Sequence, residues 1–239
     1  MNAYTVLSNA QPVSSSANNT QTVSGFRLKD PASAITHFIG MISAMAAAPF
    51  LFGKAAGHTD PAYMISGVLF IVSMILLYGA STFYHAIIAN ERVTLLLKKL
   101  DHIMIYFLIA GSYAPVCLLA LPDQQGVLLC SIVWILACAG LILTIIWVNS
   151  PKWLNSSIYI AMGWLCIFAI RDIYANLSQE GFFWLFLGGV IYTIGGVIYA
   201  LKLPLFNSLH KGFGSHEIFH LFVMAGSLCH FIMVYRCLF

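Results

Sequence analysis

The stretch from Ala62 to Ile88 reads AYMISGVLFIVSMILLYGASTFYHAII, and it contains no lysine, arginine, aspartate or glutamate. A helix needs about 20 predominantly apolar residues to cross the hydrocarbon core of a bilayer. This stretch meets that requirement with residues to spare, so we expect it to form a transmembrane helix. A membrane protein is therefore the first hypothesis for the whole chain.

Six further segments have the same apolar character. They are Ala34 to Phe52, His102 to Leu121, Val127 to Val148, Leu154 to Ile170, Phe182 to Leu201 and Ile218 to Phe239. The chain of 239 residues is 60% hydrophobic and 8% charged, with a mean hydropathy of +0.88, which excludes a soluble domain of this size. The predicted fold class is an all-α membrane protein, a seven-helix transmembrane bundle formed by residues 34–239.

Residues 1–33 precede the first predicted span. Their first 24 residues are rich in Ser, Asn, Thr and Gln. They lack the basic start and the apolar core of a signal peptide. We interpret residues 1–33 as a disordered polar tail.

The distribution of basic residues predicts the orientation. If the N-terminal tail is cytoplasmic, eight basic residues lie near that face and three near the other. The eight are Arg27, Lys29, Arg92, Lys98, Lys99, Lys152, Lys202 and Lys211; the three are Lys54, Arg171 and Arg236. Because basic residues are retained on the cytoplasmic side, we expect the N-terminus inside and the C-terminus outside.

The formal net charge of +3 does not indicate a nucleic-acid partner. The basic residues lie at the predicted membrane edges rather than in one patch. We expect them to contact anionic lipid headgroups instead.

The last apolar segment opens with HEIFH, His216 to His220. Its two histidines share one helical face, about 6 Å apart in height. Successive spans alternate in direction, so the end of the second span, with Ser81 and His85, and the start of the third, with Asp101, meet the same face. We predict that His85, His216 and His220 bind Zn²⁺. Asp101 and Ser81, as catalytic residues, would hold the attacking water.

Zinc chemistry explains why these residue types point to a hydrolase. Zinc prefers imidazole nitrogen and carboxylate oxygen, and a catalytic site supplies three protein ligands and one open position. Such a site polarises a carbonyl and activates water for attack on an amide or an ester. Ionisable groups at membrane depth persist mainly where they bind one another, an ion or a substrate.

The other histidines are assigned lesser roles. His37 could join the outer shell of the site, and His102 lies about 100° around the helix from Asp101, so it is expected at the periphery. His230 lies ten residues beyond His220 and is turned away from its face. We expect His230 to be a hydrogen-bonded core residue.

Two other functions remain open from the residues alone. An intramembrane metalloprotease is one, because His216, Glu217 and His220 match the zincin pattern, in which the glutamate is the general base. Only nineteen residues follow His220, and the additional histidine among them is His230. The second is a non-enzymatic protein, either a lipid sensor or a membrane-lytic protein.

Several motifs together are highly specific. They are Thr36-His37-Phe38-Ile39-Gly40, Ser81 with His85, Leu100-Asp101-His102-Ile103, Ile109-Ala110-Gly111-Ser112-Tyr113-Ala114-Pro115, and His216 with His220. From Asp30 to the C-terminus the chain resembles the hemolysin III family, the bacterial members of the progestin and adiponectin receptor superfamily. In that family a Glu and an Asn precede the Thr-His pair, whereas this chain has Asp30 and Ser33.

The resemblance implies a seven-helix protein with a cytoplasmic N-terminus and a zinc ion near the inner face. The residues that match the family's zinc ligands are His85, His216 and His220, and Asp101 and Ser81 match its water-side positions. Relatives are linked to lipid-amide hydrolysis of the ceramidase kind, to membrane-lipid homeostasis and to haemolysis. The expectation is a multi-pass protein of the bacterial inner membrane with membrane lipids as substrate or ligand.

Overall fold

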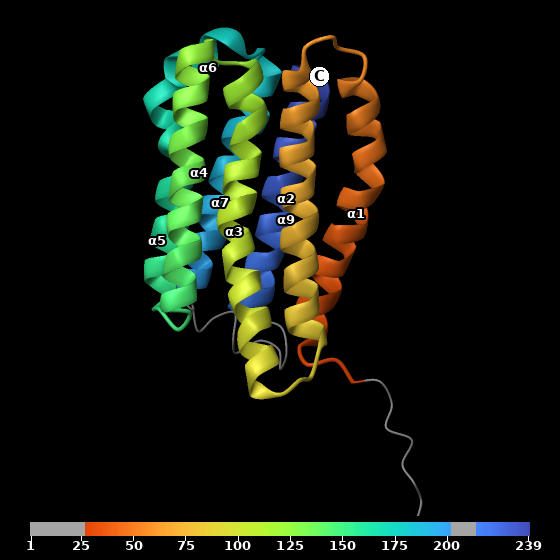
Figure 1. Ribbon diagram of the computed structural model, residues 1–239, viewed down its shortest axis with the longest axis vertical. Coiled ribbons are helices and arrows are strands. Elements are labelled where there is room, and N and C mark those ends of the chain that lie inside the picture. Colours follow the sequence, from red (N-terminus) through yellow and green to blue (C-terminus); the bar gives the residue numbers. More distant parts are fainter. Residues whose placement is uncertain (1–26, 202–213) are drawn as a thin grey trace, which may run out of the picture.

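The computed structural model describes residues 27–201 and 214–239. Within these ranges, seven helical spans are long and apolar enough to cross a membrane, which confirms the predicted fold class (Figure 1). Their bounds are α1 Pro31–Ala55, α2 Pro61–Ala86, α3 Glu91–Leu119, α4 Asp123–Ile146, a fifth span Lys152–Asn176, α7 Gln179–Leu201, and α9 Ser215–Met233 continued by the π-helical turn η2, Val234–Leu238. The fifth span consists of α5 Lys152–Gly163, the 3₁₀ turn η1 Leu165–Ala169, and α6 Ile170–Asn176.

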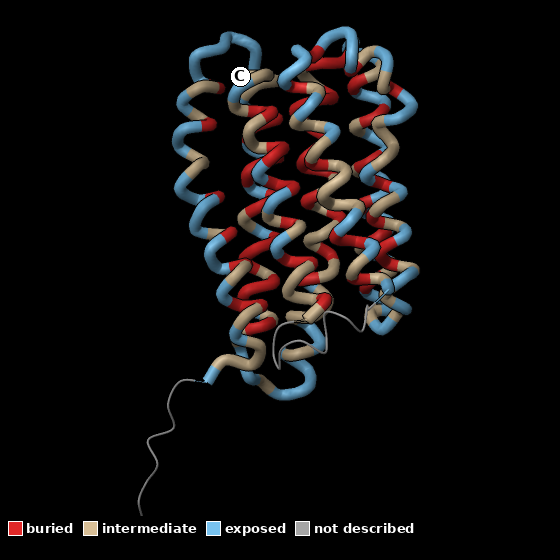
Figure 2. Tube along the Cα trace, turned by 180° about the vertical axis from the view of Figure 1, so that it is seen from behind, coloured by how far each residue is buried: buried red, intermediate tan, exposed pale blue. Residues whose placement is uncertain are grey.

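The first four helices pack against their chain neighbours, α7 packs between α5 and α9, and α1 closes the bundle against α9. Buried residues face the inside of the bundle, and exposed residues face outward (Figure 2). The outward faces of these helices carry large apolar side chains such as Phe50, Ile146 and Phe168. An apolar exterior is the arrangement expected of helices surrounded by lipid.

Side-chain caps and prolines set the starts of the first three helices. Asp60 accepts a hydrogen bond from the backbone N–H of Ala62 at 2.8 Å, which caps α2, and Asn90 caps α3 in the same way. Pro31 and Pro61 occupy first-turn positions, where the missing N–H costs nothing.

The helix α3 begins eleven residues before the predicted segment His102 to Leu121. Its polar extension is held to the end of α4. Lys98 donates to Asn149 Oδ1 at 2.7 Å, and Lys99 donates to the carbonyl of Ile145 at 2.8 Å. Apolarity alone therefore identified the membrane part of α3 but not the whole helix.

The predicted boundary at residue 33 falls inside a helix, because α1 already begins at Pro31. Most of the predicted tail, residues 1–26, lies outside the described residues, as do Lys202 and Lys211. The six other basic residues assigned to the cytoplasm lie at the end of the bundle where α1 starts, and the chain ends at the opposite end (Figure 1). Which end faces the cytoplasm stays a prediction.

The fifth span is interrupted in the middle, where a single segment from Leu154 to Ile170 was expected. The α-helix ends at Gly163 and continues as a 3₁₀ turn. The Tyr113 hydroxyl lies within hydrogen-bond distance of the carbonyls of Met162 and Gly163, at 3.0 and 2.8 Å, and accepts from the Cys166 N–H at 2.9 Å. Because lipid offers no partners to freed backbone groups, this tyrosine makes the break tolerable.

Candidate metal centre

Three histidines from two helices meet at the end of the bundle where α1 begins. His85 lies in the last turn of α2, and His216 and His220 lie in the first two turns of α9. One ring nitrogen of each lies within 4.8 Å of the others, and His85 Nε2 is 3.1 Å from His216 Nε2. The structure thus brings together the three predicted ligands, in an arrangement that could hold a metal ion.

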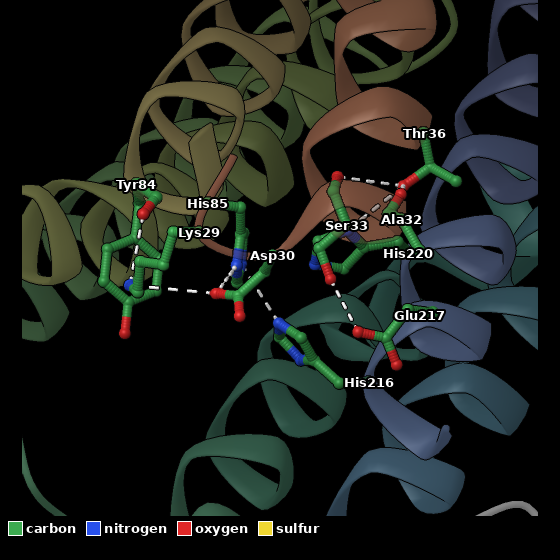
Figure 3. A network of polar contacts seen from close by, with 10 residues as sticks. All are labelled: Lys29, Asp30, Ala32, Ser33, Thr36, Tyr84, His85, His216, Glu217 and His220. Carbon is green, nitrogen blue, oxygen red and sulfur yellow. Dashed lines mark hydrogen bonds and ion pairs between the residues drawn. The ribbon is translucent and has the colours of Figure 1, made fainter. Parts of the chain in front are cut away.

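Asp30 determines which nitrogen of His85 faces this cluster. Its carboxylate oxygen Oδ2 lies 3.0 Å from His85 Nδ1, and its backbone N–H donates to the His85 carbonyl at 2.8 Å (Figure 3). An ionised carboxylate only accepts, so the proton of the imidazole must be on Nδ1. His85 Nε2 therefore presents its lone pair, as a metal ligand must.

Thr36 acts in the same way on His220. Its hydroxyl has a single proton, which donates to the carbonyl of Ala32 or Ser33, both at 3.0 Å. The Thr36 oxygen is then left to accept from His220 Nδ1, 3.5 Å away. This contact favours the tautomer with a free Nε2 lone pair, while His37 stacks on the ring at 3.7 Å between centroids.

The distances suit a transition metal. Two imidazole ligands of a tetrahedral zinc ion, at about 2.0–2.1 Å each, are separated by about 3.3 Å. The separation of 3.1 Å between the Nε2 atoms of His85 and His216 is close to this value. Two lone pairs that face each other repel unless a proton or a cation lies between them. The donor set therefore fits a zinc ion, with imidazole nitrogens as ligands.

The two predicted catalytic residues have different surroundings. Asp101 of α3 is buried and lines the same cavity as His216 and His220. Ser81 is fully buried one turn before His85, does not line this cavity, and has no hydrogen-bond partner among the described residues. His102 also lines the cavity, and its Nδ1 donates to the carbonyl of Lys98 at 2.7 Å.

Glu217 has a role that the zincin pattern does not indicate. Its Oε1 accepts from the Ser33 hydroxyl at 2.7 Å (Figure 3). Its Oε2 accepts from the Gly214 N–H, also at 2.7 Å. The second contact is one half of a capping box at the start of α9. One carboxylate oxygen thus holds α9 to α1 and the other caps α9, which disfavours a role for Glu217 as a general base.

A cavity of about 110 Å³ leads from the histidines into the middle of the bundle. The residues at its polar end include Asp101, His102, His216 and His220. Its walls are mostly apolar or aromatic and include Leu108, Ile109, Tyr159, Trp164, Phe219 and Val223. A second cavity of about 50 Å³ shares six lining residues with the first: Ser112, Tyr113, Gly163, Trp164, Gly189 and His230.

The position of His230 differs from the expectation. It is buried, as predicted, but neither ring nitrogen meets hydrogen-bond geometry with any described residue. It also lines both cavities rather than facing elsewhere. Ten residues along a regular helix turn the side chain by only about 80° from His220, and the cavity is wide enough to cover that arc.

The sequence comparisons identify the family of the chain. A model of the family described as haemolysin-III related matches residues 27–231. The chain belongs to this family. It is 39% identical over 210 residues to the hemolysin-3 homolog of Bacillus subtilis, covering 87% of this chain and 94% of the relative. Hemolysin-3 of Bacillus cereus is also 39% identical over 210 residues, with coverages of 87% and 91%.

A more distant relative extends the relationship to eukaryotes. The adiponectin receptor protein of Drosophila melanogaster is 24% identical over 212 residues, covering 82% of this chain and 48% of that protein. The haemolysin-III-related chain described here is therefore a multi-pass membrane protein of the progestin and adiponectin receptor superfamily.

The residue that sequence reasoning did not assign to the site is Asp30. It stands where the family pattern has a glutamate, but the contact with His85 depends on the chain before α1 lying against the end of α2. Lys29 reinforces this contact, because its backbone N–H donates to the Ala86 carbonyl and its ammonium lies 3.6 Å from the centre of the Tyr84 ring. The sequence signal that could have identified Asp30 was its position, where the family pattern has a glutamate.

Proposed function

We propose that the protein is a membrane-embedded, zinc-dependent hydrolase of a lipid amide or ester, acting in membrane-lipid homeostasis. The observation that supports this best is the opening of the histidine cluster, through His216 and His220, into an apolar cavity that the Asp101 carboxylate also lines. An apolar cavity with a few convergent polar groups is typical of a small-molecule site. Here its surroundings suit a lipid.

In this proposal His85, His216 and His220 hold the ion. Zinc, when bound, supplies a Lewis acid that polarises a carbonyl and activates water. Asp101 accepts the proton of the attacking water, and Ser81, whose buried hydroxyl lacks a partner among the described residues, helps to orient that water. Asp30 and Thr36 keep the ligand rings in the tautomers that bind.

Elemental analysis and lipid hydrolysis on the same purified samples test the proposal. About one zinc per chain is expected in the wild type, lost in His85→Ala and His216→Ala. His58→Ala, in which the replaced histidine stacks on Tyr63 in a loop at the other end of the bundle, is the matched control and keeps the metal. Asp101→Asn is expected to retain zinc and lose turnover of lipid amides and esters, detected by mass spectrometry.

Other outcomes identify the alternatives. Zinc without turnover of any lipid amide or ester in the wild type would indicate a sensor. Release of dye from liposomes by the purified protein, independent of zinc, would indicate a lytic protein. Turnover that is unchanged in Asp101→Asn would refute the role given to the carboxylate.

The proposed orientation has the N-terminus in the cytoplasm and the metal centre at the inner face of the bacterial plasma membrane. It is supported by the grouping of Arg27, Lys29, Arg92, Lys98, Lys99 and Lys152 at the end of the bundle that contains the histidines. Alkaline phosphatase fused after Phe239 should be active, because that enzyme requires export. An inactive fusion at normal expression would reverse the orientation.

A further inference from the structure

We propose that His230 is a recognition residue for a hydroxyl group on the lipid chain, deep in the membrane and far from the metal centre. The inference rests on the proposed function, since it assumes that the reacting carbonyl lies near His216 and His220. The inference gives a role to the part of the same cavity around His230, and it names the class of acyl chain that fits there.

Among the described residues that line this part of the cavity, His230 is the polar group without a hydrogen bond. It is 8% exposed and lines both cavities where they adjoin. The Leu185 carbonyl lies beside the ring without meeting hydrogen-bond geometry. That carbonyl can engage at most one ring nitrogen, so the other is available to an occupant of the cavity.

The neighbouring polar groups already have partners inside the protein. Tyr192 and Tyr78 both hydrogen-bond the Ser227 hydroxyl, at 2.8 and 2.7 Å. Thr193 donates to the Gly189 carbonyl at 2.7 Å and accepts from Trp164 Nε1 at 2.9 Å. At this depth His230 is therefore the group that can distinguish a lipid chain with a hydroxyl from one without.

The packing around the ring holds it in place. Tyr192 packs edge-to-face against His230, with ring centroids 5.3 Å apart and planes at 82°. One turn before Tyr192 on α7 lies Gly188, where an added Cβ would overlap the imidazole ring. A glycine in α7 thus makes room for an imidazole in α9, and the ring has little freedom to swing elsewhere.

The length of the cavity sets the position of the hydroxyl. His230 lies ten residues beyond His220, which corresponds to about 15 Å along a helix, or about a dozen methylene groups. Each water-sized group needs about 10–15 Å³ of such space, so the first cavity, of about 110 Å³, holds about 7–11 groups before the junction at His230, and the second, of about 50 Å³, continues beyond it. The two measures together indicate an acyl chain with a hydroxyl about ten to twelve carbons from its carbonyl.

The test is equilibrium competition against radiolabelled dodecanoic acid on purified, zinc-containing protein. The competitors are dodecanoic acid, 12-hydroxydodecanoic acid and, as a positional control, 6-hydroxydodecanoic acid, whose hydroxyl is too far from the carboxylate to chelate zinc. Burying a hydroxyl favours binding only if the hydroxyl finds a hydrogen-bond partner, so the 12-hydroxy acid should bind about 10-fold more tightly than dodecanoic acid to the wild type. The 6-hydroxy acid should not bind more tightly than dodecanoic acid.

Variants assign the preference to the imidazole. His230→Phe keeps a flat ring and removes both nitrogens, and His230→Leu removes them with a side chain that fits the site without a ring. The readout is the ratio of the affinities for the 12-hydroxy acid and dodecanoic acid within each variant that retains zinc, and this ratio should fall from about 10 to below 1. Tyr192→Phe removes a hydroxyl that is already hydrogen-bonded to Ser227. This variant should keep the preference for the 12-hydroxy acid.

Two results would overturn the inference: no preference for the 12-hydroxy acid in the wild type, or a preference that persists in His230→Leu. Failure of the proposed function is seen separately, as absence of zinc or of lipid hydrolysis in the same samples. Binding of neither fatty acid by zinc-containing wild type would also overturn the inference, while leaving the metal centre intact.

Discussion

Replacing Asp30 by alanine tests how the metal centre is built. The substitution removes the acceptor 3.0 Å from His85 Nδ1, so the imidazole loses the contact that fixes its tautomer and its ring orientation. Loss of such an outer partner typically weakens metal binding 10- to 100-fold. That range corresponds to about 1.4–2.7 kcal/mol of binding free energy. Asp30→Asn keeps a neutral acceptor and should fall between the wild type and the alanine variant.

The assay is competition for zinc with a chromophoric chelator, on detergent-purified protein at one pH. The matched control is Asp60→Ala, which also removes a hydrogen-bonded aspartate, but at the opposite end of α2. Its loss destabilises a helix cap by about 1 kcal/mol and should leave zinc affinity unchanged. Affinity of Asp30→Ala within threefold of the wild type, or an equal loss in Asp60→Ala, would refute the reasoning.

Three further substitutions separate structural from catalytic roles. Glu217→Gln should retain zinc and hydrolysis, because the side chain caps α9; loss of turnover with zinc retained would restore Glu217 as a candidate general base. Ser227→Ala should lower the free energy of unfolding by about 1–3 kcal/mol, because two buried tyrosine hydroxyls lose their shared partner. Thermal unfolding in detergent measures this, and an unchanged midpoint would contradict it. Gly188→Ala should be less stable than Gly189→Ala by about 1–3 kcal/mol, since only the first methyl would overlap His230; equal midpoints would count against that packing.

The sequence predicts the spans and the histidine cluster because both follow from local regularities. Apolar runs of about 20 residues define membrane helices, and a spacing of four places His216 and His220 on one helical face. Alternation of direction then brings His85 to the same end of the bundle. No alignment or distance information is required for these steps.

Other features depend on contacts that local patterns do not specify. The polar first turns of α3 are helical because Asn90 caps them and two lysines tie them to α4. Asp30 reaches His85 because the chain before α1 lies against the end of α2 through backbone hydrogen bonds. The free imidazole of His230 depends on a cavity that exists only after the interrupted fifth span has packed beside α7.

The satisfaction of buried polar groups distinguishes structure from function in this protein. In hydrocarbon an unpaired polar group costs several kcal/mol, so groups with a purely structural role should find partners, as the Tyr78–Ser227–Tyr192 chain does. Among the described residues, the buried groups without hydrogen bonds include His37, Ser81, one nitrogen of His216 and both nitrogens of His230. Two others, the hydroxyls of Tyr106 and Ser156, have no role that the structure explains. Of the first four, the three histidines line the cavity, and Ser81 lies one turn from the ligand His85. An ion held by His85 and His216 through their Nε2 atoms, and a lipid that pairs with His230, would stabilise the folded state, so both should raise the unfolding temperature of the wild type, and raise it less when His85 or His230 is replaced by leucine.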